Sequence, residues 1–294
     1  MRWKNLRKSE HVERRRGSGG GKGIAMGGGI GAIIMALIAI FVMKQPASQV
    51  IGQMTQNQGQ QQGPAKPQTE RQKQLDEFVL SIKGSTEEVW TKIFRQAGEQ
   101  YRIPKLVNYD SMTRMGDGAV ADARMGPFYY PSEEKIYIDT SFFGQMDRDL
   151  GGGGDFAYAY VIAHEVGHHI QKLTGKTTYV HQQKGRIPDA QYNRLSVRLE
   201  LQADFYAGIW AHHANKQHRQ THGTNLLEEG DIEEAMRSAR AIGDDTLQRN
   251  AGQRIQPESF NHGTSEQRMR WFLKGIRSGD LNQGGTFNIP YHQL

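Results

Sequence analysis

Residues 155–173, DFAYAYVIAHEVGHHIQKL, constrain the fold more than any other stretch of this chain. Small and apolar side chains surround the histidines, so we expect a buried helix that is capped by Asp155. Residues four apart share a helical face, which brings His164 and His168 together and leaves Glu165 about 100° round the helix. Two buried histidines without partners would be costly. The HEVGH pattern therefore predicts a metal site, with Glu165 beside the metal and Gly167 leaving room for it.

The chain has no cysteine, so any metal site must use His, Asp and Glu side chains. A metzincin needs Gly and His where Gln171 and Thr174 stand, which excludes that class. The segment RLELQADFYAG offers Glu200 instead, with Asp204 four residues later on the same face. Its apolar neighbours disfavour a solvated acidic face, the alternative reading. We expect Glu200 to be the third ligand to Zn²⁺ and Asp204 to accept the free ring N–H of a ligand histidine.

His262 lies just before a predicted helix that Thr264 or Ser265 can cap. It is either the donor that stabilises a developing oxyanion or a loop histidine with a capping role. Three tyrosines are weaker candidates for the donor: Tyr129, Tyr130 and Tyr137. Arg268, one turn further on, is placed to pair with a buried carboxylate.

Several other features are expected to be structural rather than functional. His212, His213, His218 and His222 lie on a polar helix end and are expected to be solvated. The glycine run 151–154 lacks the strand, helix and Lys-Ser/Thr context of a phosphate-binding loop, so we interpret it as a loop or hinge.

The N-terminal 22 residues carry eight basic and two acidic side chains, which accounts for the whole net charge of +6. The remainder is neutral, and binding to nucleic acid is not expected. Residues 24–43 contain no charge and are long enough to span a bilayer. The positive-inside rule then predicts a single-pass protein of the inner (cytoplasmic) membrane, with residues 1–22 as a basic cytoplasmic tail, a transmembrane helix at 23–43, and the rest outside the cytoplasm. A cleaved signal peptide and a buried core helix are the alternatives.

Residues 44–70 are rich in Gln, Pro, Ser and Thr and are expected to be a flexible linker. Residues 71–294 are expected to form one globular domain of the α+β class, mainly helical with a small sheet. Helices are predicted at 74–83, 87–101, 155–173, 190–216, 230–249 and 264–277, with Ser85 and Glu88 as a capping box for the second. Strands are predicted within KLVNYD, GPFYYP and KIYIDT, between residues 105 and 140.

The chain resembles the bacterial neutral zinc metallopeptidases that carry an N-terminal membrane anchor. The resemblance extends over most of the chain and is carried by GPFYYPSEEKIYID, GDFAYAYVIAHEVGHHIQ, LSVRLELQADFYAGIWAHH, GDIEEAMRSARAIGDD and PESFNHGTSEQRMRWF. It implies a zincin-like fold, His164, His168 and Glu200 as zinc ligands, and Glu165 as the catalytic acid/base. The HExxH…ExxxD pattern is similar to that of gluzincins in general.

Together these observations predict a zinc metalloendopeptidase that hydrolyses peptide bonds of a peptide or protein substrate through a zinc-activated water, with Glu165 and His262 as catalytic residues. The strand near 135–139 is expected to align the substrate by edge pairing. The alternatives are a non-catalytic, membrane-tethered module whose zinc site serves an interaction, and an adaptor that works through its basic tail.

Overall fold

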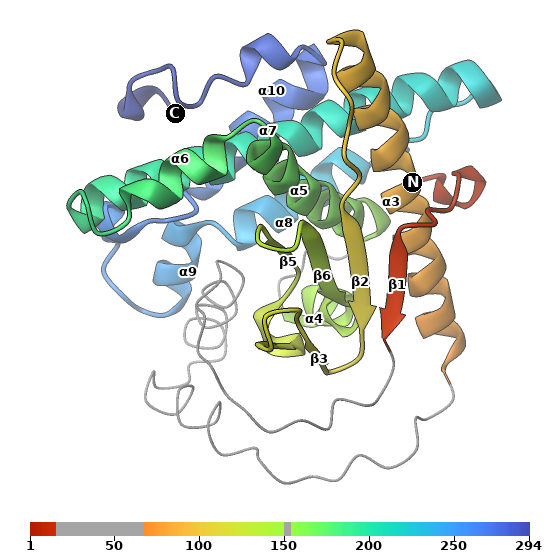
Figure 1. The fold of residues 1–294 in the computed structure, drawn as a ribbon, viewed down its shortest axis with the longest axis horizontal. Helices are drawn as coiled ribbons and strands as arrows, with labels where there is room; N and C mark the ends of the chain where they lie inside the picture. Colours follow the sequence, from red (N-terminus) through yellow and green to blue (C-terminus); the bar gives the residue numbers. More distant parts are fainter. Residues whose placement is uncertain (16–67, 150–153) are drawn as a thin grey trace, which may run out of the picture.

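The computed structural model describes residues 1–15, 68–149 and 154–294, and shows a mainly helical protein with a small sheet, as predicted (Figure 1). The α-helices are α3 (Glu70–Gln96), α4 (Ser141–Asp149), α5 (Asp155–Leu173), α6 (Lys176–Gln183), α7 (Asp189–His222), α8 (Asp231–Ala241), α9 (Asp244–Asn250) and α10 (Ser265–Ser278). The strands are β1 (Val12–Arg15), β2 (Lys105–Tyr109), β3 (Met112–Arg114), β4 (Val120–Asp122), β5 (Phe128–Tyr130) and β6 (Lys135–Asp139). Short 3₁₀ turns lie at Trp3–Asn5, Ala123–Met125, Pro257–Ser259, Leu281–Gln283 and Tyr291–Gln293.

The main sheet has four strands in the order β1-β2-β6-β5, and β3 and β4 form a separate hairpin. Strand β2 is parallel to both of its neighbours, whereas β5 is antiparallel to β6. Strand β6 is therefore paired on both sides and β5 ends the sheet. The expectation that residues 135–139 offer a free edge is wrong, since Lys135–Asp139 is an interior strand.

Helix α3 is one continuous helix of 27 residues, where the sequence predicted two. Its capping box is formed by Thr69 and Gln72, not by Ser85. The middle of the helix is buried under the N-terminal segment. A Cβ atom on Gly84 would lie 2.0 Å from the main-chain oxygen of Arg7, so the missing side chain makes room for that segment.

The N-terminal residues are part of the folded domain, not a separate tail. Strand β1 pairs with β2 along its full length, from Val12 opposite Leu106 to Arg15 opposite Tyr109. The preceding residues lie against α3, as Figure 1 shows for the red segment beside the orange helix. Residues 1–15 therefore pack with the described residues that follow 68, and are not separate from them.

Ion pairs and an indole hydrogen bond fasten this segment to three helices. The Arg7 guanidinium pairs with Glu87 at 2.7 Å and with Glu88 at 3.1 Å. The indole N–H of Trp3 donates to Asp155, the first residue of α5, at 2.9 Å. The amino group of Met1 lies 3.2 Å from Asp231 of α8. Basic side chains of the segment thus form ion pairs with acidic residues of the same chain.

This arrangement corrects the predicted topology. A single-pass span would place residues 1–22 across a membrane from the domain, yet Val12–Arg15 form a strand of its sheet, so the predicted single-pass, inner-membrane location is wrong. The predicted span at 23–43, with its bilayer contact, and nearly all of the predicted linker 44–70 lie outside the described residues. Within the described ranges, no helix combines the length and apolar character needed to cross a membrane.

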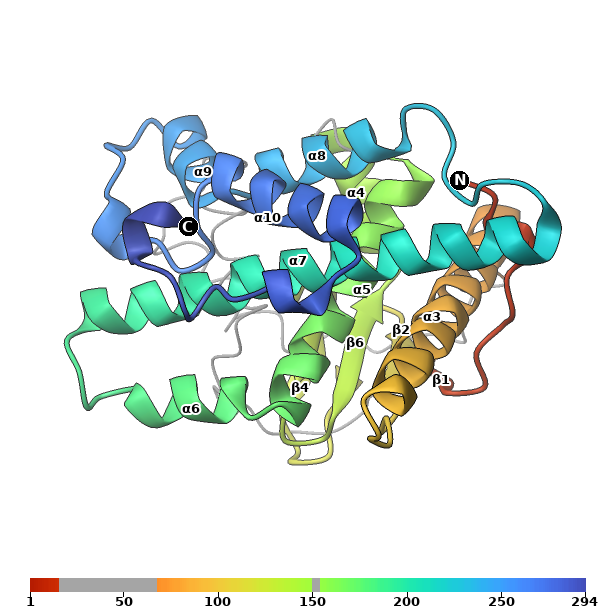
Figure 2. The same ribbon diagram turned by 90° about the horizontal axis from the view of Figure 1, so that it is seen from above.

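Helix α7 runs through the length of the domain, with α10 along one side and α5 crossing it (Figure 2). Glycines allow these helices to come close. A Cβ atom on Gly208 of α7 would lie 2.2 Å from a main-chain oxygen of α10, and one on Gly167 of α5 would lie 3.0 Å from the backbone of Ala203. Gly167 therefore leaves room for the backbone of α7, which brings Glu200 toward the two histidines.

Candidate metal centre

Helix α5 spans the predicted residues 155–173 and is buried over most of its length. Its predicted cap is wrong: the N-cap is Gly154, with φ of 135°, and Asp155 makes no side-chain cap. The N–H of Phe156 instead donates to the Glu234 carboxylate of α8 at 3.3 Å. Trp3 and Glu234 thus hold the start of the helix that carries the HEVGH pattern.

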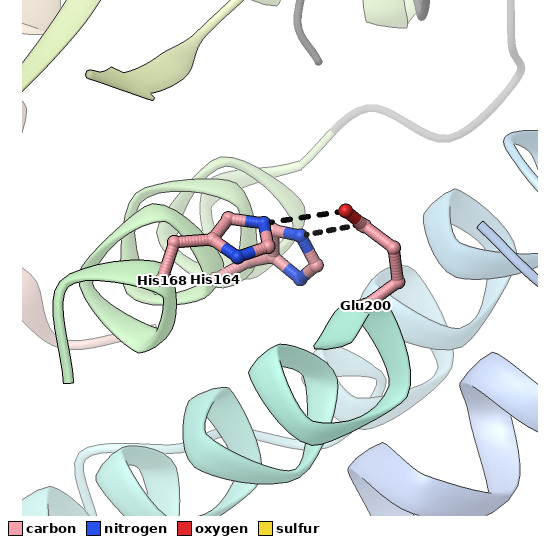
Figure 3. A group of neighbouring side chains, drawn as sticks. All are labelled: His164, His168 and Glu200. Atoms are coloured by element: carbon pink, nitrogen blue, oxygen red, sulfur yellow. Dashed lines mark ion pairs between the residues drawn. The ribbon is translucent and has the colours of Figure 1, made fainter. Parts of the chain in front are cut away.

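The two histidines of α5 face Glu200 of α7 (Figure 3). Nε2 of His164 lies 3.3 Å from one carboxylate oxygen of Glu200, and Nε2 of His168 lies 3.5 Å from the other. All three side chains are at least 88% buried. The structure therefore brings together the three residues that the sequence nominated as metal ligands.

This donor set fits zinc. The three ligand atoms lie within 4.8 Å of one another. In a tetrahedral site with ligand bonds of about 2.0–2.2 Å, neighbouring ligand atoms are roughly 3.3 Å apart. The two distances between a histidine nitrogen and a Glu200 oxygen, 3.3 and 3.5 Å, are close to this value. One oxygen of Glu200 is buried without a hydrogen-bond partner among the described residues. Three protein ligands of the type His₂Glu leave a fourth position open, as catalytic zinc sites do.

Asp204 of α7 contacts His164 on the side of the ring away from Glu200. One of its oxygens lies 2.8 Å from Nδ1 of His164. The same carboxylate accepts hydrogen bonds from Arg268, at 2.9 and 3.0 Å, and from the hydroxyl of Tyr160, at 2.5 Å. Because Asp204 accepts from Nδ1, Nε2 is the ring nitrogen left to bind a metal. The expected pairing of Arg268 with a buried carboxylate is confirmed.

The second histidine has a partner that the sequence analysis missed. Nδ1 of His168 lies 2.9 Å from the side-chain oxygen of Gln171, which is completely buried. The Gln171 amide donates to the main-chain oxygen of Leu199 at 2.6 Å. Gln171 lies three residues after His168, a spacing at which two side chains on one helix can contact each other. This spacing could have identified Gln171 from the sequence.

Electrostatics at the site favour the metal-binding forms of His168 and Glu200, whereas they favour the protonated form of His164, whose Nε2 proton a metal ion would displace. Burial lowers the pKa of His168 to about 4 and keeps the ring neutral. Burial alone would raise the pKa of Glu200, but His168 and His164 lower it to about 2. Burial would also lower the pKa of His164, yet Asp204 outweighs it and raises the value to about 10. The two histidines differ because Asp204 contacts only His164.

Glu165 is buried next to this group and belongs to a different face of α5. Burial raises the pKa of its carboxyl to about 7, although a backbone hydrogen bond from Tyr129 lowers it in part. Tyr129 belongs to β5, the end strand of the sheet. Glu165 therefore lies between the metal-binding face of α5 and a sheet edge.

His262 is held by Asp244, the first residue of α9. Its Nδ1 lies 3.1 Å from one oxygen of Asp244, and the other oxygen accepts three backbone N–H groups, of residues 261–263, at 2.7–2.9 Å. Nε2 of His262 is buried and has no partner within the described part of the chain. The ring interacts electrostatically with Glu200. The helix cap nearby is Thr264, so His262 has no capping role.

The three tyrosines offered as weaker oxyanion donors are engaged elsewhere. Tyr129 bonds to His169 at 2.9 Å, Tyr130 to Asp117, and Tyr137 to Glu133 at 3.1 Å. Among the predicted donors, His262 thus differs in having a ring nitrogen, Nε2, with no hydrogen-bond partner in the described residues.

Comparisons with known proteins agree with this donor set. A profile of the family described as "Putative neutral zinc metallopeptidase" matches residues 1–287. The uncharacterized protein YpfJ of Escherichia coli (strain K12) is 44% identical over 292 residues, which cover 98% of this chain and 99% of that protein. The uncharacterized protein Rv2575 of Mycobacterium tuberculosis (strain ATCC 25618 / H37Rv) is 36% identical over 216 residues, covering 71% and 70%. No solved structure matches the chain.

The family is described by zinc and by peptidase activity, and the cluster of His164, His168 and Glu200 supplies a place for that metal. The match extends over the N-terminal strand as well as the helices that bear the cluster. This chain therefore belongs to the neutral zinc metallopeptidase family.

Proposed function

We propose that this protein hydrolyses peptide bonds with a zinc ion held by His164, His168 and Glu200. The observation that supports this most strongly is the donor set itself: three convergent buried ligands, with the carboxyl group of Glu165 beside them. A closed site with four protein ligands would favour a structural role, whereas three ligands favour catalysis. This is the reason to prefer a peptidase over a zinc-binding interaction module.

Zinc, when bound, acts as a Lewis acid that polarises the scissile carbonyl and makes water a better nucleophile. Glu165 takes the proton of the attacking water and passes it to the nitrogen of the leaving amine. Burial holds this carboxyl group away from bulk water, and its place one residue after His164 keeps it beside the metal without ligating it. Asp204 and Gln171 keep the histidine rings in the binding orientation.

His262 stabilises the oxyanion of the tetrahedral intermediate. Burial would lower the pKa of His262, but Asp244 raises it above its ordinary value and so favours the protonated ring. In that form Nδ1 donates to Asp244 and Nε2 also carries a proton, on the side of the ring away from Asp244. A preorganised donor of this kind contributes most where water is excluded, and His262 is 1% exposed.

The substrate backbone pairs with β5. This strand ends the main sheet, and the main chain of Tyr129 contacts Glu165. An extended peptide added at this edge would run past the carboxyl group that handles the proton. We therefore assign the substrate-pairing role to Phe128–Tyr130, in place of residues 135–139.

The test uses the full chain, purified without chelator. We expect one zinc per chain at the cluster by elemental analysis and cleavage of a denatured protein mixture that stops when a zinc chelator is added. Glu165→Gln should retain the zinc and lose the cleavage. Glu266→Gln, exposed on α10, is the control and should behave as wild type. Cleavage that survives in Glu165→Gln would rule out this mechanism, and zinc without any cleavage would favour the interaction module.

A further inference from the structure

The C-terminal end of α7 carries a second pair of histidines four residues apart. The ring centroids of His218 and His222 are 4.6 Å apart, compared with 4.7 Å for His164 and His168. Both pairs occupy positions i and i+4 of a helix, the spacing that lets two rings approach one metal ion. The sequence suggested that these histidines are solvated, but His218 is 3% exposed.

The environment of His218 is that of a ligand histidine. Its Nδ1 lies 2.7 Å from the main-chain oxygen of Thr224, so Nδ1 carries the proton. The neutral ring then has a lone pair on Nε2, which is buried and has no partner among the described residues. A ring N–H donated to a carbonyl is the usual arrangement behind a metal-binding imidazole. The exposed ring of His222 lies against it.

A cavity of about 210 Å³ adjoins this pair and is lined by both histidines, Asn5, Glu88, Gln217 and Thr221, among others. Arg7 also lines the cavity, but its charge is paired with Glu87 and Glu88. The last turn of α7 adds the negative end of the helix dipole, because its final carbonyls have no intrahelical partners. The local field is therefore compatible with a cation.

The other two histidines of the helix do not share these properties. His212 bonds through Nδ1 to the main-chain oxygen of Ile276, at 2.8 Å, and His213 through Nε2 to that of Gly279, at 2.9 Å. Adjacent residues also point about 100° apart on a helix and cannot converge as an i, i+4 pair does.

We propose that His218 and His222 form a second metal site, for a divalent transition-metal cation such as Zn²⁺, Ni²⁺ or Cu²⁺. The two imidazoles supply two ligands, and water in the adjoining cavity completes the coordination. With two protein ligands the site is weaker than the His₂Glu cluster. Because the cavity is also lined by Asn5, a cation here lies between α7 and the N-terminal segment.

The test is the difference in zinc bound by two full-length chains at micromolar free zinc, measured by equilibrium dialysis on protein without a histidine tag. His222→Gln changes an exposed side chain and leaves the fold intact. We expect it to bind one zinc fewer than wild type, or to bind the weaker zinc at least about 10-fold less tightly. His213→Gln should bind as wild type. Equal binding by wild type and His222→Gln would overturn the proposal.

A second measurement identifies the ligand atom. The ¹⁵N resonance of His218 Nε2, assigned by its loss in His218→Gln, should shift when the weaker zinc equivalent binds, and should not respond in His222→Gln. A resonance that stays unchanged in wild type would contradict the site. Because these readouts compare variants at one helix end, they are independent of whether the His164, His168 and Glu200 cluster is catalytic.

Discussion

The carboxylate of Asp204 lies 2.8 Å from Nδ1 of His164, on the side of the ring away from the nitrogen that faces Glu200. One carboxylate thereby sets the tautomer of a candidate ligand and neutralises the buried guanidinium of Arg268. A metal ligand, its orienting group and a buried cation are linked through a single residue.

Replacing Asp204 by Asn should weaken zinc binding by about 10–100-fold, because His164 loses the charge that orients it. The same change leaves Arg268 buried without a counter-charge, which costs about 3–5 kcal/mol of folding stability. Competition with a chromogenic chelator measures the first effect and thermal unfolding the second. Asp189→Asn, at the exposed start of the same helix, is the matched control. Wild-type zinc affinity in Asp204→Asn would show that the contact does not tune the site.

His262→Gln should lower kcat/KM by about 10²–10³-fold, through kcat more than KM, because an oxyanion donor acts mainly in the transition state. Zinc content should stay at the wild-type value, since His262 is not among the three ligands. The exposed His292 provides a control, His292→Gln, with no expected effect. A variant with normal kcat, or one that loses its zinc, would remove His262 from the proposed role.

The metal cluster could be predicted from sequence because each part of it depends on local spacing. Helix α5 occupies the predicted residues, and the four-residue steps from His164 to His168 and from Glu200 to Asp204 place side chains on one face whatever the tertiary fold. The partner of His168 was missed because Gln171 is polar and uncharged, so nothing in its type signals burial. Asp244 was missed because it lies 18 residues from His262, and only the tertiary fold brings the two together.

The N-terminal strand could not be predicted in this way. Its sequence, VERR, is charged and alternates poorly, and its pairing with β2 depends on backbone hydrogen bonds that no side-chain pattern reports. The basic residues were assigned to a cytoplasmic tail because their acidic partners, Glu87 and Glu88, are 80 residues away in sequence. The sequence predicted two helices in place of α3 because Gly84 and Ser85 are typical of a helix boundary. Only the tertiary fold shows that the N-terminal segment packs on Gly84.

Glu87 should make folding stability depend on pH. Its carboxylate contacts Lys83 at 2.8 Å and Arg7 at 2.7 Å. Burial alone would raise its pKa, but these charges and the Ser9 hydrogen bond leave the pKa below the ordinary value of 4.5. A lowered folded-state pKa contributes stability that is present above about pH 4.5 and is lost as the pH falls through the folded value.

Glu87→Gln should therefore lower the free energy of unfolding by about 3–5 kcal/mol at pH 7, because Lys83 stays buried without a counter-charge. The difference from wild type should shrink progressively below pH 4.5. Urea unfolding at a series of pH values measures it. Glu77→Gln removes an exposed pair with Lys8 and should change stability by less than about 1 kcal/mol. If the difference in unfolding free energy between wild type and Glu87→Gln grows as the pH falls, the pKa of Glu87 is not lowered in the folded protein.

The sign of the stability change caused by Gly84→Ala tests whether the N-terminal segment packs on α3. In an uncovered helix, Ala in place of Gly adds about 1 kcal/mol of stability. Here the new Cβ atom would lie 2.0 Å from the main-chain oxygen of Arg7 and 3.1 Å from the nitrogen of Ser9. Neither contact can be relieved by turning a side chain, so we expect net destabilisation of about 1–3 kcal/mol, measured by urea unfolding.

The same substitution in a chain that lacks residues 1–15 supplies the control. Without the segment nothing opposes the new methyl group, and Gly84→Ala should then stabilise that shorter chain or leave it unchanged. The shorter chain should also be less stable overall and prone to associate, because removal of β1 exposes the edge of β2. A peptide of residues 1–15 added in trans should reverse the association. If Gly84→Ala stabilises both chains alike, the segment does not occupy this position on α3.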